Sequence, residues 1–154
     1  MQVADLMMKK GTRLIMVGMN ETVEMAIRLL RRENVGAVIV KDVVNTEGNT
    51  AVGVFSERDV LEALDKHGAA ALKFPISRLM STNIISCSPD DEIGRVFDLM
   101  VQHHIRHVPV FERGAVIGVI SIRDLLALRG EMFGLPRGFE AARAGAVAQT
   151  PAHS

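Results

Sequence analysis

The sequence predicts a mixed α/β fold built from two copies of one β-α-β-β-α unit. Three stretches of the first half return in the same order in the second half. Residues 53–59 (GVFSERD) return as 118–124 (GVISIRD), residues 35–40 (VGAVIV) as 105–110 (IRHVPV), and residues 3–7 (VADLM) as 76–80 (ISRLM). The spacing between matches changes only between the stretches, which indicates loop insertions in a duplicated unit. Because a repeated unit seldom buries its apolar face alone, we expect the copies to pack together and any ligand site to lie between them.

Composition limits the classes of protein to consider. The 154-residue chain is 48% hydrophobic and 23% charged, which is typical of a globular protein with a substantial core. Its eighteen basic and eighteen acidic side chains cancel, so we expect neither nucleic acid nor a membrane as a partner. No apolar run approaches the ~20 residues that span a bilayer. The single cysteine, Cys87, permits no internal disulfide and favours a cytoplasmic protein with an inert buried thiol.

Each unit begins with a short lead-in helix and a strand. The first strands are predicted at residues 14–17 (LIMV) and 84–87 (IISC), which are rich in aliphatic side chains. Second strands follow at residues 37–40 and 108–110. Pro109 has no N–H to donate, so the second strand of copy two must lie at an edge or leave that amide position unpaired. Third strands are expected at residues 51–55 and 115–120.

Two helices complete each unit. The first carries an apolar stripe with helical spacing in each copy: Val23, Ala26 and Leu30 in copy one, and Ile93, Val96, Phe97 and Met100 in copy two. The second begins at Ser56 or Ser121, since serine is a favourable N-cap. We therefore expect residues 1–67 to form the first repeat, 68–75 a connector and 76–129 the second repeat. Residues 130–154, rich in Gly, Ala, Pro and Arg, are expected to form a flexible tail.

The chemistry concentrates where the third strand meets the second helix. The serine hydroxyl and the first amides of the helix offer an anion site. Three residues later, Asp59 or Asp124 can accept both hydroxyls of a ribose, and Arg58 or Arg123 suits phosphate. Together these groups predict a nucleotide site. Ser-x-x-Asp is also an ordinary capping pattern, and a purely structural role remains the alternative.

These segments resemble the cystathionine β-synthase (CBS) domain, present twice as a Bateman module over about residues 1–129. The Gly-x-x-Ser-x-x-Asp segments and the strands at 35–40 and 106–110 carry the resemblance. It implies that the units pack through facing sheets about a pseudo-twofold axis, with helices outside and two clefts between them. It also implies a flat homodimer. Each cleft of the family holds an adenosine ligand: AMP, ADP or ATP, and sometimes NAD(H) or S-adenosylmethionine.

The same resemblance assigns residues to each cleft. One cleft is expected to join the helix start of copy two to the first strand of copy one, with Arg106 on the phosphate: Ser121, Arg123, Asp124, Leu14, Ile15 and Val35. The other is expected to join the helix start of copy one to copy two: Ser56, Arg58, Asp59, Ile84, Ile85, Gly36 and His107. Because only copy two has an arginine where copy one has Gly36, we expect the Arg106 cleft to bind phosphate more strongly.

The function implied is a small regulatory protein that senses adenine nucleotides and modulates an unidentified client by conformational change. A structural dimerisation module with unoccupied clefts is the alternative. An enzyme is not expected, because no nucleophile with a base and no catalytic cofactor site is laid out. His103, His104 and His107 form the one cluster worth testing for a metal, and we expect none there because the first two diverge on a helix.

Overall fold

The computed structural model describes residues 1–11, 13–42 and 50–132. Two lobes follow one another along the chain. The first contains β1 (Met16–Gly18), α2 (Val23–Glu33), β2 (Ala37–Lys41), β3 (Ala51–Ser56) and α3 (Glu57–His67). The second contains α4 (Ile93–His103), β4 (His107–Glu112), β5 (Ala115–Ser121) and α5 (Ile122–Met132). The lobes are preceded by the lead-in helix α1 (Val3–Lys10) and joined by two 3₁₀ turns, η1 (Gly68–Lys73) and η2 (Ile76–Arg78).

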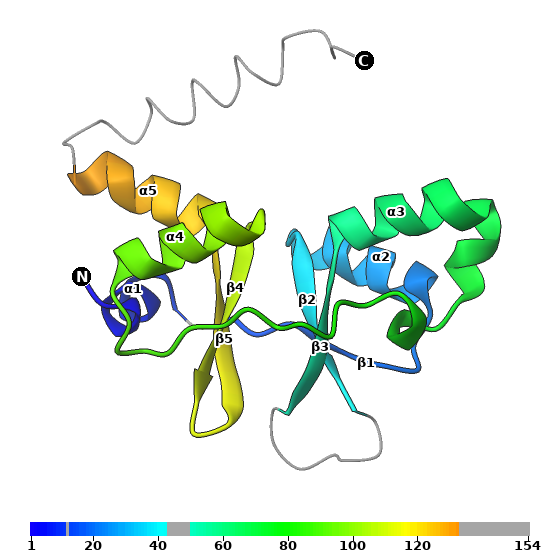
Figure 1. The fold of residues 1–154 in the computed structure, drawn as a ribbon, viewed down its shortest axis with the longest axis horizontal. Coiled ribbons are helices and arrows are strands. Elements are labelled where there is room, and N and C mark those ends of the chain that lie inside the picture. The colour runs from blue at the N-terminus through cyan, green and yellow to red at the C-terminus, as the bar shows by residue number, and fades with distance from the viewer. Residues whose placement is uncertain (12, 43–49, 133–154) are drawn as a thin grey trace, which may run out of the picture.

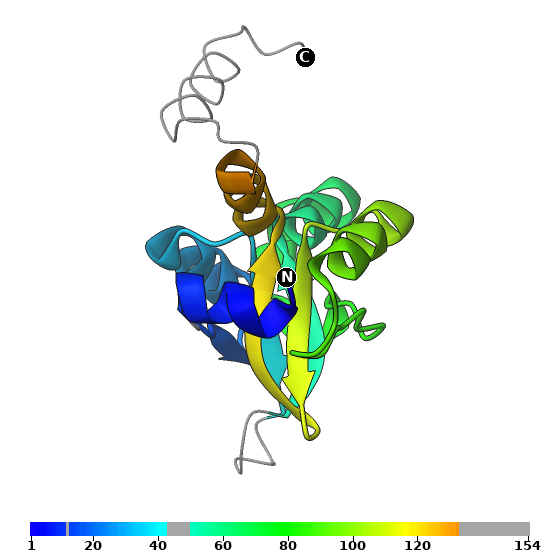
Figure 2. The same cartoon turned by 90° about the vertical axis from the view of Figure 1, so that its left-hand side faces the viewer.

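The lobes lie side by side with their strands in the middle (Figure 1). In the first lobe β1 is parallel to β2, and β2 is antiparallel to β3; in the second lobe β4 is antiparallel to β5. Helices α3, α4 and α5 lie toward one end of the strands, and the β4–β5 turn lies at the other end (Figures 1 and 2). The predicted mixed α/β fold with two related units is confirmed. Helix α5 continues three residues past the expected end of the second repeat at Arg129, and residues 133–154 of the expected tail lie outside the described part.

The strand predicted at residues 84–87 is wrong, and Pro109 explains why. In the first lobe Ile39 donates its N–H to the Ile15 carbonyl at 3.0 Å, which ties the β1 segment to β2. Pro109 holds the corresponding position of β4 and has no N–H to donate. The equivalent segment therefore meets β4 only as an isolated parallel bridge between Cys87 and Val110. Within the described residues β5 is the only strand that pairs with β4, so the expectation that the strand containing Pro109 lies at an edge is confirmed.

Each lead-in segment packs on the other copy's lobe. Val3, Leu6 and Met7 of α1 are buried in the core of the second lobe, beside side chains of α4, β4 and β5. The N–H of Val3 donates to the Asp91 carbonyl at 2.8 Å. Conversely, Ile76 of η2 is fully buried in the core of the first lobe. The two repeats thus exchange their first segments, and neither core is complete without the other copy.

A close backbone contact holds the second lead-in segment against β3. Val54 and Ser81 exchange two backbone hydrogen bonds of 2.9 Å. The contact requires Gly53, because a Cβ there would lie 2.8 Å from the Ser81 carbonyl oxygen. As a result, residues 81–85 of the second copy run past the start of α3 in the first copy.

Candidate functional site

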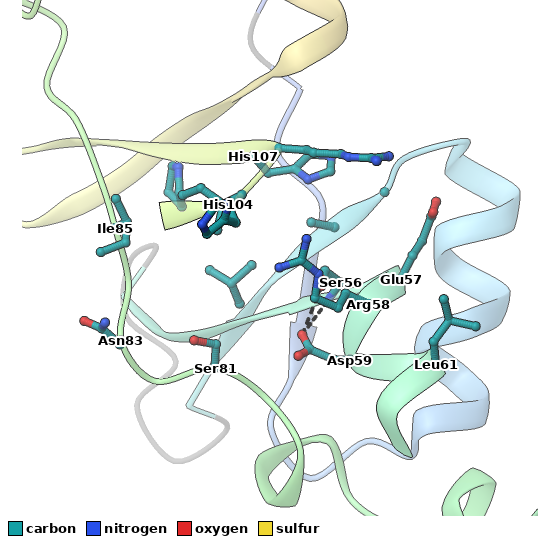
Figure 3. A pocket seen from close by; sticks show the side chains of 16 residues that line it. Ser56, Glu57, Arg58, Asp59, Leu61, Ser81, Asn83, Ile85, His104 and His107 are labelled. Carbon is teal, nitrogen blue, oxygen red and sulfur yellow. Dashed lines mark hydrogen bonds between the residues drawn. The ribbon is translucent and has the colours of Figure 1, made fainter. Parts of the chain in front are cut away.

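A pocket of about 400 Å³ lies between the two copies. The start of α3 forms one wall, the segment after Ser81 a second, and the entry into β4 a third (Figure 3). The pocket is lined by Gly36, Ala37, Val54, Ser56, Glu57, Arg58, Asp59, Leu61, Ser81, Asn83, Ile85, His104, Ile105, Arg106, His107 and Pro109. Both copies contribute, so neither forms the pocket alone.

The Ser56–Asp59 pair is a capping box at the start of α3. Ser56 ends β3 in an extended conformation, and Asp59 Oδ2 accepts hydrogen bonds from the Ser56 N–H at 2.8 Å and from its hydroxyl at 3.1 Å. The capping role weighed in the sequence is therefore real. Both hydrogen bonds that Asp59 accepts within the described residues go to Oδ2. The other carboxylate oxygen is left to accept hydrogen bonds from a bound molecule, so capping and ligand binding are compatible here.

Burial raises the pKa of the Asp59 carboxyl above its ordinary value, and the hydrogen bonds from Ser56 oppose that rise. The charged form is thus only partly compensated in this structure. Hydroxyl groups that donate to the carboxylate would favour the ionised form further. Asp59 is therefore suited to a ligand that carries neighbouring hydroxyls.

Cationic and imidazole side chains line the same pocket. Arg58 follows Ser56 on α3, and Arg106 precedes β4, whose entry also carries His107. This differs from the expectation that Arg106 belongs to the cleft of Ser121. The Arg106 carbonyl does contact that helix start, where it accepts the Ile122 N–H at 2.8 Å. Arg106 therefore lines the same pocket as Arg58, and it does not single out the Asp124 cleft as the stronger phosphate site.

Gly36 of the first copy, which corresponds to Arg106 of the second, lies against the His107 ring. A Cβ on Gly36 would lie 2.7 Å from His107 Cε1, so a larger residue there would require the ring to shift. Burial lowers the pKa of His107 below 6.5, with Arg123 and Arg106 lowering it further and Glu57 and Asp124 opposing them. The ring is therefore mainly neutral at pH 7. It fills space between the two helix starts and adds little charge.

The second helix start has the same cap but a different neighbour. The Ser121 N–H donates to Asp124 Oδ2 at 2.8 Å, and the Asp124 N–H donates to the Ser121 hydroxyl at 3.3 Å. Lys10 Nζ also donates to Asp124 Oδ2, at 2.6 Å. The carboxylate that was expected to receive a ribose thus already forms an ion pair.

Leu14, Ile15 and Val35 were assigned to the cleft of Ser121 and do not line the Ser56 pocket, whereas Ile84 was assigned to the Ser56 pocket. Ile15 and Val35 pack against the core of the first lobe, and Leu14 is half-buried. Ile84 is absent from the pocket lining, whereas its neighbour Ile85 is part of it. The pocket unites seven of the predicted residues: Gly36, Ser56, Arg58, Asp59, Ile85, Arg106 and His107.

Sequence reasoning missed Ser81, Asn83, Glu57 and His104 among the lining residues. Ser81 and Asn83 lie just beyond the repeated lead-in segment, and extending that match would have pointed to them. Glu57 lies inside the Ser-x-x-Asp motif. His104 belonged to the histidine cluster; it ends α4 in a left-handed conformation with φ 55°, and this turns the chain toward the pocket.

Other chemistry is limited in the described part of the chain. Residues 1–11, 13–42 and 50–132 contain no group of three or more His, Cys, Asp or Glu side chains placed to hold a metal ion. Cys87 is buried in the second-lobe core, and burial raises the pKa of its thiol to about 12, so it carries no thiolate at neutral pH. Among the described helices, none combines the length and apolar character that crossing a membrane requires.

Comparisons with known proteins fit this geometry. The CBS domain family model matches residues 3–66 and 76–131. The CBS domain-containing protein YhcV of Bacillus subtilis is 29% identical over 114 residues, which are 74% of this chain and 77% of that protein. The crystal structure of a CBS-domain containing protein from Agrobacterium tumefaciens is 32% identical with a TM-score of 0.79, covering 84% of this chain and 99% of that one.

A CBS domain protein from Pyrobaculum aerophilum, solved in complex with AMP, is 25% identical with a TM-score of 0.71 and covers 81% of this chain and 90% of that one. The family match spans well over half of the chain, and the two matched ranges correspond to the two copies seen in the sequence and in the fold. The chain therefore belongs to the CBS domain family and carries the domain twice.

Proposed function

We propose that this protein is a regulatory module that binds an adenine nucleotide in the pocket around Ser56 and Asp59. One observation supports the proposal: the pocket is lined by a partly compensated carboxylate, Asp59, and by Arg58 and Arg106. A carboxylate suits the two hydroxyls of ribose, and guanidinium groups suit phosphate. The Pyrobaculum relative, which was solved with AMP, supports an adenosine ligand.

The two arginines of the pocket favour a phosphate-bearing ligand. S-adenosylmethionine carries a positive sulfonium, which two arginines would repel, whereas AMP, ADP, ATP and NADH bring negative charge. A charge-assisted hydrogen bond contributes about 1.5–3 kcal/mol, so the phosphate contacts alone would separate AMP from adenosine by about tenfold or more. We accordingly propose AMP or a longer adenine nucleotide as the ligand.

Calorimetric titration of the purified protein tests this proposal. We expect AMP to bind with micromolar affinity, adenosine to bind more weakly, and S-adenosylmethionine to bind weakest of the three. Native mass spectrometry of the freshly purified protein would reveal a ligand retained from the cell. Failure of AMP, ATP, NADH and adenosine alike to bind at millimolar concentration would refute the proposal.

Binding would act on the arrangement of the two copies. A ligand in this pocket contacts the α3 start of one copy and the β4 entry of the other, so it favours the arrangement in which both reach it. We propose that this bias is what a client protein reads, without turnover of the nucleotide. Small-angle scattering with and without saturating AMP checks the step, and identical profiles would contradict it.

A second copy of the chain is the proposed structural partner. The exposed large apolar side chains include Leu61 and Leu64 on α3, Phe97 and Val101 on α4, and Leu126 on α5. Exposed apolar groups of this kind mark association surfaces. We expect a homodimer by light scattering and a shift toward monomer in Phe97→Asp. A monomeric wild-type protein at micromolar concentration would rule this partner out.

A further inference from the structure

The second Ser-x-x-Asp motif forms an ion pair that the first motif does not form within the described residues. Lys10, the last residue of α1, donates to Asp124 Oδ2 at 2.6 Å and to the Val119 carbonyl at 2.7 Å. Both charged side chains are mostly shielded from water, with exposed fractions of 25% for Lys10 and 20% for Asp124. The same Oδ2 atom caps α5 through the Ser121 N–H. The contact is thus built into the helix start rather than made by a fully solvated side chain.

The duplicated sequence shows what this contact replaces. Val119 is the counterpart of Val54, whose carbonyl accepts the backbone N–H of Ser81 at 2.9 Å. In the second lobe the ammonium group of Lys10 donates to that carbonyl instead. Continued for three more residues, the shift of 73 that relates residues 3–7 to 76–80 places Lys10 opposite Asn83, which lines the first pocket. A neutral amide therefore stands in one cleft where the other has an ammonium group.

The electrostatic consequences differ accordingly. Within the described residues, Asp59 accepts hydrogen bonds only from Ser56, so its carboxylate is available to a ribose. Asp124 already accepts a charge-assisted bond, and a ribose would have to displace an ammonium group held by a second acceptor as well. A ligand at the second cleft would therefore first have to break an existing interaction.

We infer that Lys10 is the residue that decides which cleft binds nucleotide, by occupying Asp124 and leaving the Asp59 pocket as the high-affinity site. This inference rests on the proposed function and adds a specificity determinant to it. The chain binds one nucleotide tightly, although both copies carry the Ser-x-x-Asp motif. The second motif is held closed by a segment of the first copy, because the lead-in segments are exchanged.

Calorimetry with AMP tests the inference on the full chain. The wild type should bind one equivalent per chain, and Lys10→Asn, which installs the residue of the counterpart position, should bind two. Lys10→Asn combined with Asp124→Ala should return to one equivalent. The reciprocal change Asn83→Lys should weaken binding at the first pocket by about tenfold or more. Lys66→Asn, which removes the same charge from an exposed position on α3, is the matched control and should behave as the wild type.

The outcomes separate the two claims. Two equivalents of equal affinity in the wild type, or one equivalent in Lys10→Asn, would overturn the role of Lys10 and leave the proposed function intact. Loss of AMP binding in Lys10→Asn would show that Lys10 serves the ligand, which also overturns the inference. Absence of AMP binding in the wild type and in Lys10→Asn would refute both claims.

Discussion

Replacing Asp59 or Asp124 with alanine removes the same kind of cap from two helices, with different functional consequences. Each aspartate caps a helix through a serine three residues earlier. Losing such a cap costs about 0.5–2 kcal/mol of stability. Removing Asp59 also relieves the burial that raises its pKa, so we expect the lower end of that range, about 0.5–1 kcal/mol. Asp124→Ala loses the Lys10 ion pair as well, which adds at most about 1 kcal/mol for a partly exposed pair.

The effects on the ligand should diverge. Asp59→Ala removes a charged acceptor from the pocket, a loss of about 1.5–3 kcal/mol, or roughly ten- to 150-fold in the dissociation constant of AMP. Asp124→Ala should leave that constant almost unchanged. Thermal unfolding with and without AMP reports both quantities, since saturation at about 100 times the dissociation constant stabilises a protein by about 2.7 kcal/mol. Equal loss of AMP-induced stabilisation in the two variants, or a larger loss in Asp124→Ala, would refute the assignment of the site to Asp59.

Three further predictions concern the neighbours of the pocket. Arg106→Ala should weaken AMP about tenfold and leave adenosine unaffected, and calorimetry with both ligands decides whether the guanidinium contacts phosphate. The pKa of His107 is lowered from 6.5, so as the pH falls the unfolded chain takes up a proton before the folded chain does. The stability of the wild type should therefore fall as the pH drops. The melting temperature of His107→Asn should depend less on pH between 7.5 and 5.5 than that of the wild type. Gly53→Ala should cost about 1–3 kcal/mol in chemical denaturation, because its Cβ would lie 2.8 Å from a backbone oxygen. Gly94→Ala is the control: nothing lies within 4 Å of its Cβ in α4, so it should be stabilising, and a loss as large as that of Gly53→Ala would contradict the steric argument.

The order of elements within each copy followed from local patterns. Apolar spacing located α2 and α4, and the serine residues that end β3 and β5 located α3 and α5. Pro109 predicted the unpaired amide position, because the absence of an N–H is a property of the residue itself. The conformation of residues 84–87 could not be predicted from those residues alone, because it depends on the neighbouring strand β4. Since Pro109 of β4 has no N–H to donate, residues 84–87 make only one bridge to that strand. Local chemistry thus identified the elements, and pairing decided how long each one runs.

The sequence by itself determines the duplicated Ser-x-x-Asp motif. It also determines the capping role and the acceptor chemistry of the motif, since both depend on residues within one helical turn. Which cleft each distant side chain enters depends on how the copies are placed against each other. Tertiary packing alone brought Arg106 to the pocket that Ser56 lines, and it alone carried α1 across to the second lobe, where Lys10 contacts Asp124. In the sequence, the two copies carry the same Ser-x-x-Asp motif and look equivalent. The exchanged lead-in segments bring a different partner to each motif, because the contacts that define a cleft join residues about 25 to more than 100 positions apart.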